Sequence, residues 1–226
     1  MNSYSGTDNL EVMAEAVNYN AFLLSLIRSH LRPGQRIIDI GAGIGTFARA
    51  LREEGYDVLC FEPDLLQAER LAAEGLPTVT DVADLPTSVF DVAYSMNVLE
   101  HIADDLEALT QWRQLLAPKG RLLLYVPAFQ CLYSSMDRKV GHFRRYRRKE
   151  LAFKAKHAGF HVASAAYADS IGFVASVVYK LTRNESGSID RKALVAYDRF
   201  LFPISRLMDR ILGRVIGKNV YVIAER

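Results

Sequence analysis

The chain has few of the residues that hold small secreted proteins together or bind structural zinc. Its 226 residues include only two cysteines, Cys60 and Cys131, which excludes a disulfide framework and a zinc site of paired cysteines. The net charge of +2 is small for a general nucleic-acid binder. No apolar run approaches the roughly 20 residues that a membrane span requires. Residues Met1 to Leu10 are polar rather than a signal sequence, so we expect a cytoplasmic protein.

Three glycines lie between an apolar strand and the start of a helix. The stretch Asp39-Ile40-Gly41-Ala42-Gly43-Ile44-Gly45-Thr46-Phe47 follows β-branched residues, and helical periodicity continues to Arg52 before Gly55. Because glycine has no Cβ, it allows both a turn with positive φ and close approach of the backbone to a ligand. The first turn of the helix offers unpaired N–H groups. The sequence therefore predicts a strand, a loop and a helix that bind a nucleotide-like cofactor.

Polar residues follow the next three predicted strands. The strands are expected at residues 58–61, 77–80 and 90–95, and their tips carry Glu62, Asp81 and Asn97. The carboxyl ends of parallel strands meet at one edge of an open α/β sheet, where ligands bind. An acid at the tip of the second strand can accept both hydroxyls of a ribose. Glu62 could equally be a helix cap or a solvated carboxylate.

The loop does not fit a dinucleotide fingerprint. The pattern G-x-G-x-x-G starting at Gly41 requires glycine where Thr46 stands, whereas the chain reads G-x-G-x-G after an acid. Two further tracts follow in order, FDVAYSMNVLEHI from Phe90 and LAPKGRLLLYV from Leu116. With these motifs the chain resembles the class I, Rossmann-like S-adenosylmethionine-dependent methyltransferases from about Arg36 to Pro127.

The resemblance implies a fold and a set of cofactor contacts. The implied fold is α/β, a doubly wound and mostly parallel seven-stranded sheet whose last strand is antiparallel. In that family the glycine loop holds the amino-acid end of S-adenosylmethionine, the acid after the second strand binds the ribose, and an aspartate after the third strand meets the adenine amine. By position, the implied cofactor-binding residues are Tyr19, Asp39, Gly41, Ala42, Gly43, Gly45, Glu62, Pro63, Asp81, Val82 and Asn97.

A helix is predicted over Glu11 to Leu31, with apolar side chains near one face. In the methyltransferases that the chain resembles, this leading helix lies across the cofactor pocket. Asn18, Tyr19 and Asn20 are therefore candidates to close over the sulfonium. The alternative is that Tyr19 packs on the sheet and the asparagines face water.

The segment after the fifth predicted strand is basic and aromatic. It contains G-H-F-R-R-Y at 141–146, which resembles one branch of the class I family, where this stretch forms the wall facing the acceptor. The candidate catalytic residues are His142, Tyr146 and His101, and the candidate acceptor-binding residues are Tyr133, Arg144 and Arg145. A histidine can take a proton and an arginine can hold an anion. The alternatives are a structural hydrogen bond from His142 and RNA contacts by the basic and aromatic side chains.

Glu100 and His101 also suggest a metal site. Small-RNA 3′-end methyltransferases that resemble this chain at the fourth strand use E-x-x-E-H and a distant histidine to hold Mg²⁺, and Glu100, His101 and His142 are similar to that set. The first acidic position is Asn97 in this chain, which removes an anionic oxygen that Mg²⁺ favours. We therefore expect no metal, and we expect His101 to shape the pocket or take part in catalysis.

A long helical insertion is expected between the last two strands, which are predicted at residues 159–167 and 219–224. The intervening 168–218 is far longer than a hairpin loop and shows helical periodicity around 171–181 and 189–215, with Pro203 breaking or bending the second helix. Apolar residues and arginines fall on different faces. We expect a cap over the acceptor pocket; the alternative is peripheral contact with an anionic membrane.

These features indicate one domain over 1–226. It comprises a helical cover at 1–34, a cofactor-binding core at 35–167, an acceptor cap at 168–218 and a last strand at 219–226. The expected function is S-adenosylmethionine-dependent methyl transfer to an oxygen or nitrogen of a small-molecule or lipid-linked acceptor. The alternatives are an RNA methyltransferase and an NAD(P)- or nucleotide-binding protein that shares only the sheet. The sequence implies neither a nucleic-acid partner nor an obligate protein partner.

Overall fold

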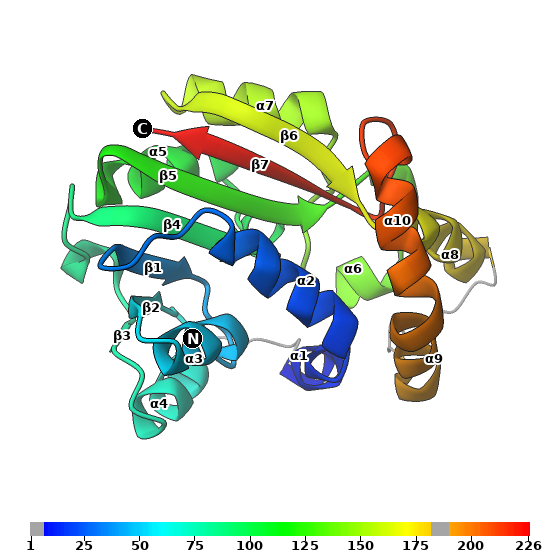
Figure 1. Cartoon of the computed structure of the whole chain (residues 1–226), viewed down its shortest axis with the longest axis horizontal. Coiled ribbons are helices and arrows are strands. Elements are labelled where there is room, and N and C mark those ends of the chain that lie inside the picture. The colour runs from blue at the N-terminus through cyan, green and yellow to red at the C-terminus, as the bar shows by residue number, and fades with distance from the viewer. Residues whose placement is uncertain (1–6, 182–189) are drawn as a thin grey trace.

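A seven-stranded sheet forms the centre of the protein (Figure 1). The computed structural model describes residues 7–181 and 190–226, so residues 1–6 of the expected cover and 182–189 of the expected cap lie outside the described residues. The strands are β1 (Arg36–Ile40), β2 (Asp57–Phe61), β3 (Thr78–Val79), β4 (Phe90–Met96), β5 (Leu116–Pro127), β6 (His161–Ala168) and β7 (Asn219–Glu225). Their order is β3-β2-β1-β4-β5-β7-β6, and β7 runs antiparallel to both of its neighbours. This arrangement confirms the expected fold class.

Helices cover both faces of the sheet (Figure 1). They are α1 (Thr7–Ala14), α2 (Val17–Arg28), α3 (Thr46–Glu53), α4 (Leu65–Ala73), α5 (Asp105–Leu115), α6 (Ser135–Lys139), α7 (Arg148–His157), α8 (Ser170–Leu181), α9 (Arg191–Ala196) and α10 (Phe202–Leu212). Successive residues of β5 face opposite layers, because Leu122 belongs to the core that includes Trp112 of α5, whereas Leu123 belongs to the core that includes Leu51 of α3. Burial on both faces explains why the second half of β5, residues 122–127, is a continuous apolar run.

The strand order reverses at β1, which pairs with β2 on one side and β4 on the other. The carboxyl ends of β1 and β4 therefore diverge into loops on opposite sides of a crevice, which is where open α/β sheets bind ligands. The glycine loop follows β1, and Asn97 and the short helical turn η2 (Leu99–His101) follow β4. The fold thus brings the two most informative tracts of the sequence to one place.

The N-terminal segment is two helices, and the prediction of one helix over 11–31 was wrong. The chain turns at Glu15 and Ala16 between α1 and α2. The first N–H groups of α2 are capped from far away in the sequence: the Asp198 carboxylate accepts hydrogen bonds from the backbone N–H groups of Asn18 and Tyr19, each at 2.8 Å. A cap supplied by a residue 180 positions away cannot be seen in local periodicity.

The insertion between β6 and β7 is helical, as expected, but its second helix is divided. A π-helical turn, η4 (Tyr197–Leu201), separates α9 from α10, and Pro203 lies in the first turn of α10. Proline has no N–H to donate to the preceding turn, so a change of helix type here is expected. Figure 1 shows α8, α9 and α10 together beyond the carboxyl ends of β5 and β6. In residues 7–181 and 190–226, no helix has both the length and the apolar character to cross a bilayer.

Candidate active site

A cavity of about 210 Å³ opens at the crevice between β1 and β4. It is bordered by the glycine loop, by α1 and α2, by the tip of β4 and by the segment from Met136 to Arg145. The sequence-predicted residues that line it are Tyr19, Asn20, Asp39, Gly41, Ala42, Gly43, Asn97, Glu100, His101, His142 and Arg145. The structure therefore brings together residues from four separate tracts of the chain.

The glycine loop presents bare backbone to this cavity. Gly41 has a φ of +76°, and a Cβ there would lie 2.4 Å from a methyl group of Val98, so no other residue fits. Gly43 has a φ of +55° and meets only Leu10, at 3.5 Å, on the side where a Cβ would stand. An open, left-handed glycine at a cavity wall allows a ligand to contact the main chain directly.

Asp39 is a buried acid at the base of the cavity. Its exposure is 2%, and the Tyr94 hydroxyl donates to Oδ2 at 2.9 Å. Burial raises the pKa of Asp39 to about 7, because a carboxylate loses hydration in this position. A cationic ligand group beside Asp39 would favour the ionised form and so lower this pKa.

Glu62 fastens the glycine loop to the tip of β2. Its Oε2 accepts the N–H of Gly43 at 2.7 Å, and its Oε1 accepts the N–H of Asp64 at 2.9 Å. Burial raises the pKa of the Glu62 carboxyl, and the two backbone donors oppose that shift. Glu62 is not in the cavity lining, but it is one hydrogen bond away through Gly43.

Several other predicted cofactor contacts lie outside the cavity lining. They are Gly45, which packs against Leu71 and Leu76, together with Pro63, Asp81 and Val82, which are exposed near the tips of β2 and β3. The Asp81 carboxylate accepts the N–H of Ala83 at 2.9 Å and caps the turn η1 (Val82–Asp84). The roles of these four residues stay predictions.

Asn97 and Tyr19 form the wall opposite the glycine loop. Asn97 adopts a φ of +57°, an uncommon conformation that asparagine tolerates well. Its side-chain amide lies 3.5 Å from the Tyr19 hydroxyl and its Oδ1 accepts from Asn219 at 3.4 Å. Burial raises the pKa of Tyr19 to about 12, so this phenol stays neutral.

The loop after β5 is organised by Asp137. This buried carboxylate bonds the His142 Nδ1 at 2.8 Å and forms a paired contact with the Arg145 guanidinium, at 2.8 and 2.9 Å. The two cationic or donor partners hold the pKa of Asp137 well below its usual range, against the effect of burial. Because Asp137 orients both side chains, His142 and Arg145 face the cavity in fixed positions.

Three residues expected to contact the acceptor do not line the cavity. Tyr146 is fully buried, and its hydroxyl donates to Asp105 at 2.9 Å, so its catalytic role stays a prediction that this position does not support. Arg144 also binds Asp105, at 2.7 Å, and the carbonyl of Ala103. The Tyr133 hydroxyl donates to the carbonyl of His142 at 2.7 Å. Arg144 and Tyr133 therefore stabilise the loop that carries His142 and do not face the cavity.

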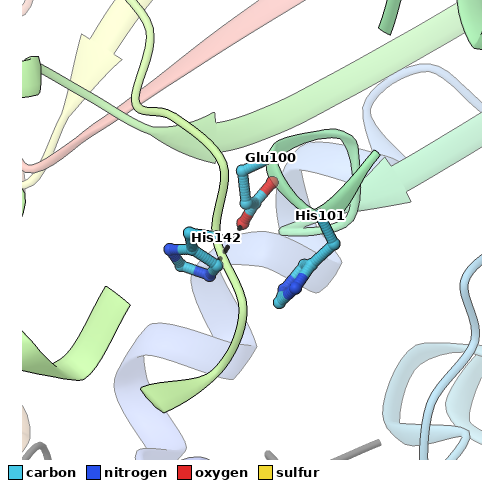
Figure 2. A group of neighbouring side chains, drawn as sticks. All are labelled: Glu100, His101 and His142. Carbon is cyan, nitrogen blue, oxygen red and sulfur yellow. Dashed lines mark ion pairs between the residues drawn. The ribbon is translucent and has the colours of Figure 1, made fainter. Parts of the chain in front are cut away.

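His101, His142 and Glu100 converge at one side of the cavity (Figure 2). The two imidazole rings are 4.5 Å apart and almost perpendicular, and Nε2 of His142 is 3.7 Å from Glu100 Oε1. Burial raises the pKa of Glu100 to about 8, and burial together with the neighbouring His142 lowers the pKa of His101 to about 4. These shifts favour the uncharged forms of Glu100 and His101.

Sequence reasoning missed the part of the cavity wall formed by Lys218 and Asn219. These two residues could have been predicted, because an antiparallel last strand begins at the edge where the parallel strands end. Burial lowers the pKa of Lys218. Leu10 and Met13 of α1 were also missed, since the break between α1 and α2 was not predicted.

Of the described residues in the expected acceptor cap at 168–218, only Lys218 lines this cavity, so a roof over the acceptor stays a prediction. Within residues 170–181 and 190–215, none contributes to the lining. The insertion acts on the cavity indirectly, because Asp198 holds Asn18 and Tyr19, and Phe202 packs edge-on against the Tyr19 ring at 5.6 Å.

Solved structures share this fold. The methyltransferase in the Haloferax volcanii complex with the Trm112 methyltransferase activator superposes with a TM-score of 0.67 and 17% identity, covering 98% of this chain and 93% of that one. A SAM-dependent methyltransferase from Thermotoga maritima superposes with a TM-score of 0.64 and 18% identity, covering 98% of this chain and 97% of that one. Haemonchus contortus phosphoethanolamine N-methyltransferase 2, solved with S-adenosyl-L-methionine, superposes with a TM-score of 0.62 and 21% identity. The match covers 92% of this chain and 52% of that one. At these identities the similarity is one of fold.

Curated relatives match shorter stretches. A ubiquinone biosynthesis O-methyltransferase of Cereibacter sphaeroides is 37% identical over 100 residues, 40% of each chain, and one of Xylella fastidiosa is 25% identical over 183 residues, 70% of each chain. An uncharacterised transposon protein of Streptomyces fradiae is 30% identical over 136 residues, 55% of this chain. The chain spans 39% and 43% of the length of the first two relatives it matches. The family described as "Methyltransferase domain" matches residues 9–165, and the chain belongs to that family.

Proposed function

We propose that the protein uses S-adenosylmethionine to methylate an oxygen or nitrogen nucleophile of a small-molecule acceptor. The observation that carries the proposal is the bare backbone at Gly41 and Gly43, which opens beside the buried Asp39 into the cavity at the strand-order reversal. Membership of the methyltransferase family supports it, and several relatives are named ubiquinone biosynthesis O-methyltransferases.

The residues present fit the donor. Asp39 and the glycine backbone would hold its amino-acid end, Glu62 and Pro63 its ribose, and Asp81 and Val82 its adenine. Gly43 supports this fit, because the space where a Cβ would stand is open to the cavity and only a methyl group of Leu10 lies near it. Bound S-adenosylmethionine supplies a methyl group that the sulfonium has already activated.

The chain's own residues supply position and shielding. Tyr19 and Asn97 form a neutral, hydrogen-bonded wall, while Leu10, Met13 and Leu23 close the cavity with apolar surface. Alignment of the acceptor with the donor and exclusion of water lower the barrier of such a transfer. His142 and His101 face the space where the acceptor would lie, and Arg145 or Lys218 could meet an anionic group.

The experiment is calorimetric titration with S-adenosylhomocysteine. We expect binding by the wild type and a loss of about 10- to 100-fold in affinity for Glu62→Gln, because hydrogen bonds to a charged group contribute about 1.5–3 kcal/mol. Glu69→Gln, at an exposed position of α4, is the matched control. Binding of NAD in place of S-adenosylhomocysteine would overturn the proposal in favour of a nucleotide-binding protein, and salt-dependent binding of RNA would favour an RNA substrate.

We also propose that the insertion rests on an anionic membrane and that the acceptor is lipid-linked. Eleven of the eighteen large hydrophobic side chains that are exposed in the described residues lie between Val174 and Val215. Phe200, Leu207 and Ile211 are 63%, 62% and 80% exposed. The exposed Arg199, Arg210 and Arg214 flank them, which is the charge arrangement that attracts anionic headgroups. Flotation with vesicles measures this binding.

A further inference from the structure

Glu100 is a buried acid without a hydrogen-bond partner on another described residue. It is completely buried in η2, and apart from the effect of its own backbone N–H, which lowers the carboxyl pKa, neither carboxylate oxygen is paired by a hydrogen bond. A buried carboxylate in such a position is costly unless it is neutralised or bound to a cation. Because Glu100 borders the cavity beside His101 and His142, a cation held between these three side chains would neutralise its carboxylate.

Each of the two neighbouring imidazoles is oriented by a second contact. His142 Nδ1 bonds the Asp137 carboxylate at 2.8 Å, and Asp137 is itself paired with Arg145. A carboxylate paired in this way accepts hydrogen bonds, so this contact suits the tautomer with the proton on Nδ1, which leaves Nε2, 3.7 Å from Glu100 Oε1, available as a ligand. His101 is hydrogen-bonded to the backbone of Val140. Histidines that bind metals are almost always held by such outer contacts to a carboxylate or carbonyl.

We propose that Glu100, His101 and His142 bind a divalent transition-metal cation of the zinc type, with an open coordination position facing the cavity. One atom from each side chain can be chosen so that all three lie within 4.8 Å of one another (Figure 2). Ligands around tetrahedral zinc are roughly 3.3 Å apart, and the 3.7 Å between Glu100 Oε1 and His142 Nε2 is already close to that separation.

The donor set decides which metal fits. Two imidazole nitrogens and one carboxylate oxygen suit zinc and its transition-metal neighbours, whereas Mg²⁺ favours oxygen ligands. Asn97 in place of an acid disfavours Mg²⁺, but a cation that prefers nitrogen donors does not require an anionic oxygen at that position. Three protein ligands and one open position are characteristic of catalytic rather than structural zinc.

The metal site itself does not depend on the proposed function. Only the identity of the group that fills the open coordination position rests on that function. That group would be an oxygen of the methyl acceptor, since the site and the glycine loop border the same cavity. Binding to a Lewis acid makes a hydroxyl more acidic, so the cation would favour an oxygen nucleophile.

The test is titration of the metal-stripped full chain with Co²⁺, read by calorimetry and by visible absorption, with Zn²⁺ as competitor. We expect one Co²⁺ per chain, an absorption band that Zn²⁺ removes, and affinities at least tenfold weaker in Glu100→Gln and His142→Ala. His157→Ala is the control, because His157 is exposed on α7 away from the cavity. Circular dichroism shows whether each variant is folded.

The outcomes separate the two proposals. Absence of Co²⁺ binding by the wild type, or equal binding by the wild type and both folded ligand variants, overturns the metal site. If S-adenosylhomocysteine still binds in that case, the proposed function stands and His142 acts without a metal. Conversely, Co²⁺ binding without S-adenosylhomocysteine binding supports the metal site and overturns the proposed donor.

Discussion

Asp39 gives the proposed donor site a dependence on pH. Its pKa of about 7 means that the carboxyl is mostly protonated at lower pH, and only the ionised form attracts a cationic amino group. We expect the affinity for S-adenosylhomocysteine to rise about tenfold between about pH 6 and about pH 8 and then level off. Titration calorimetry across this range measures the slope.

The control for this prediction is Asp39→Asn, which should bind more weakly at high pH and show a flat profile. Asp57→Asn changes an exposed acid at the start of β2 and should keep the wild-type slope. A wild-type slope in Asp39→Asn would show that another group titrates. The same shift affects stability: the folded state holds this proton more tightly than the unfolded state, so the contribution of Asp39 falls as pH rises from about 4 to about 7.

The sequence allowed candidate functional residues to be identified, but it did not show which way their side chains point. The sequence identified His142, Arg144, Arg145 and Tyr146 as one functional group, yet two of them face the cavity and two bind Asp105. The segment is an irregular loop, so it has no period from which the direction of a side chain can be derived. The glycine loop was easier, because close approach of backbone to ligand restricts the residue type itself.

Asp198 connects the insertion to the helix that walls the cavity. Replacing it by alanine removes two hydrogen bonds at the start of α2, so Asp198→Ala should lower the free energy of unfolding by about 1 kcal/mol. Because Tyr19 loses its anchor, the affinity for S-adenosylhomocysteine should fall by about threefold or more. Denaturant unfolding and calorimetry measure the two effects.

Asp190→Ala is the matched control for that element. Asp190 caps its own helix α9 through the N–H of Ala193 at 2.9 Å, so its loss should lower stability without changing donor affinity. Equal affinity in the two variants would contradict the link from Asp198 to Tyr19.

Strands were predicted better than the helical insertion. Each of the five strands predicted with explicit ends beyond the glycine loop lies within a few residues of its expected place, because buried strands are short apolar runs that end at polar tips. The break between α1 and α2 and the π turn before α10 depend on Asp198 and on packing against Phe22 and Tyr19. Tertiary contacts of this kind leave no local pattern.

At the scale of the molecule, the exposed apolar face predicts membrane binding. The protein should float with vesicles of equal parts phosphatidylcholine and phosphatidylglycerol, and added salt should weaken binding because it screens the arginines. Ile211→Asp should reduce the bound fraction by about tenfold or more, since burial of an isoleucine contributes about 1.5–3 kcal/mol. Flotation on a density gradient measures the fraction.

The matched control is Phe153→Asp, which makes the same charge change at a 59% exposed position of α7. It should bind vesicles as the wild type does. Wild-type protein that stays with the soluble fraction, or equal losses in both variants, would contradict the membrane proposal. In either case the insertion would keep its role of holding α2.

The sheet could be anticipated because strand tips, loop lengths and the resemblance agreed with one another, including the antiparallel last strand. The position of the helical insertion relative to the cavity could not be anticipated. Amphipathic periodicity shows that a helix has an apolar face, but it does not show which surface covers that face. Here much of it is exposed.

The position of β7 has a consequence for synthesis. β6 ends at Ala168 and reaches the sheet only by pairing with β7, which begins at Asn219. A growing polypeptide therefore exposes β6 as an orphan edge until the later strand leaves the ribosome, a delay of several seconds at about 5–20 residues per second. During that interval its open backbone groups can pair with another nascent chain, so the order of translation makes this corner of the sheet prone to aggregation.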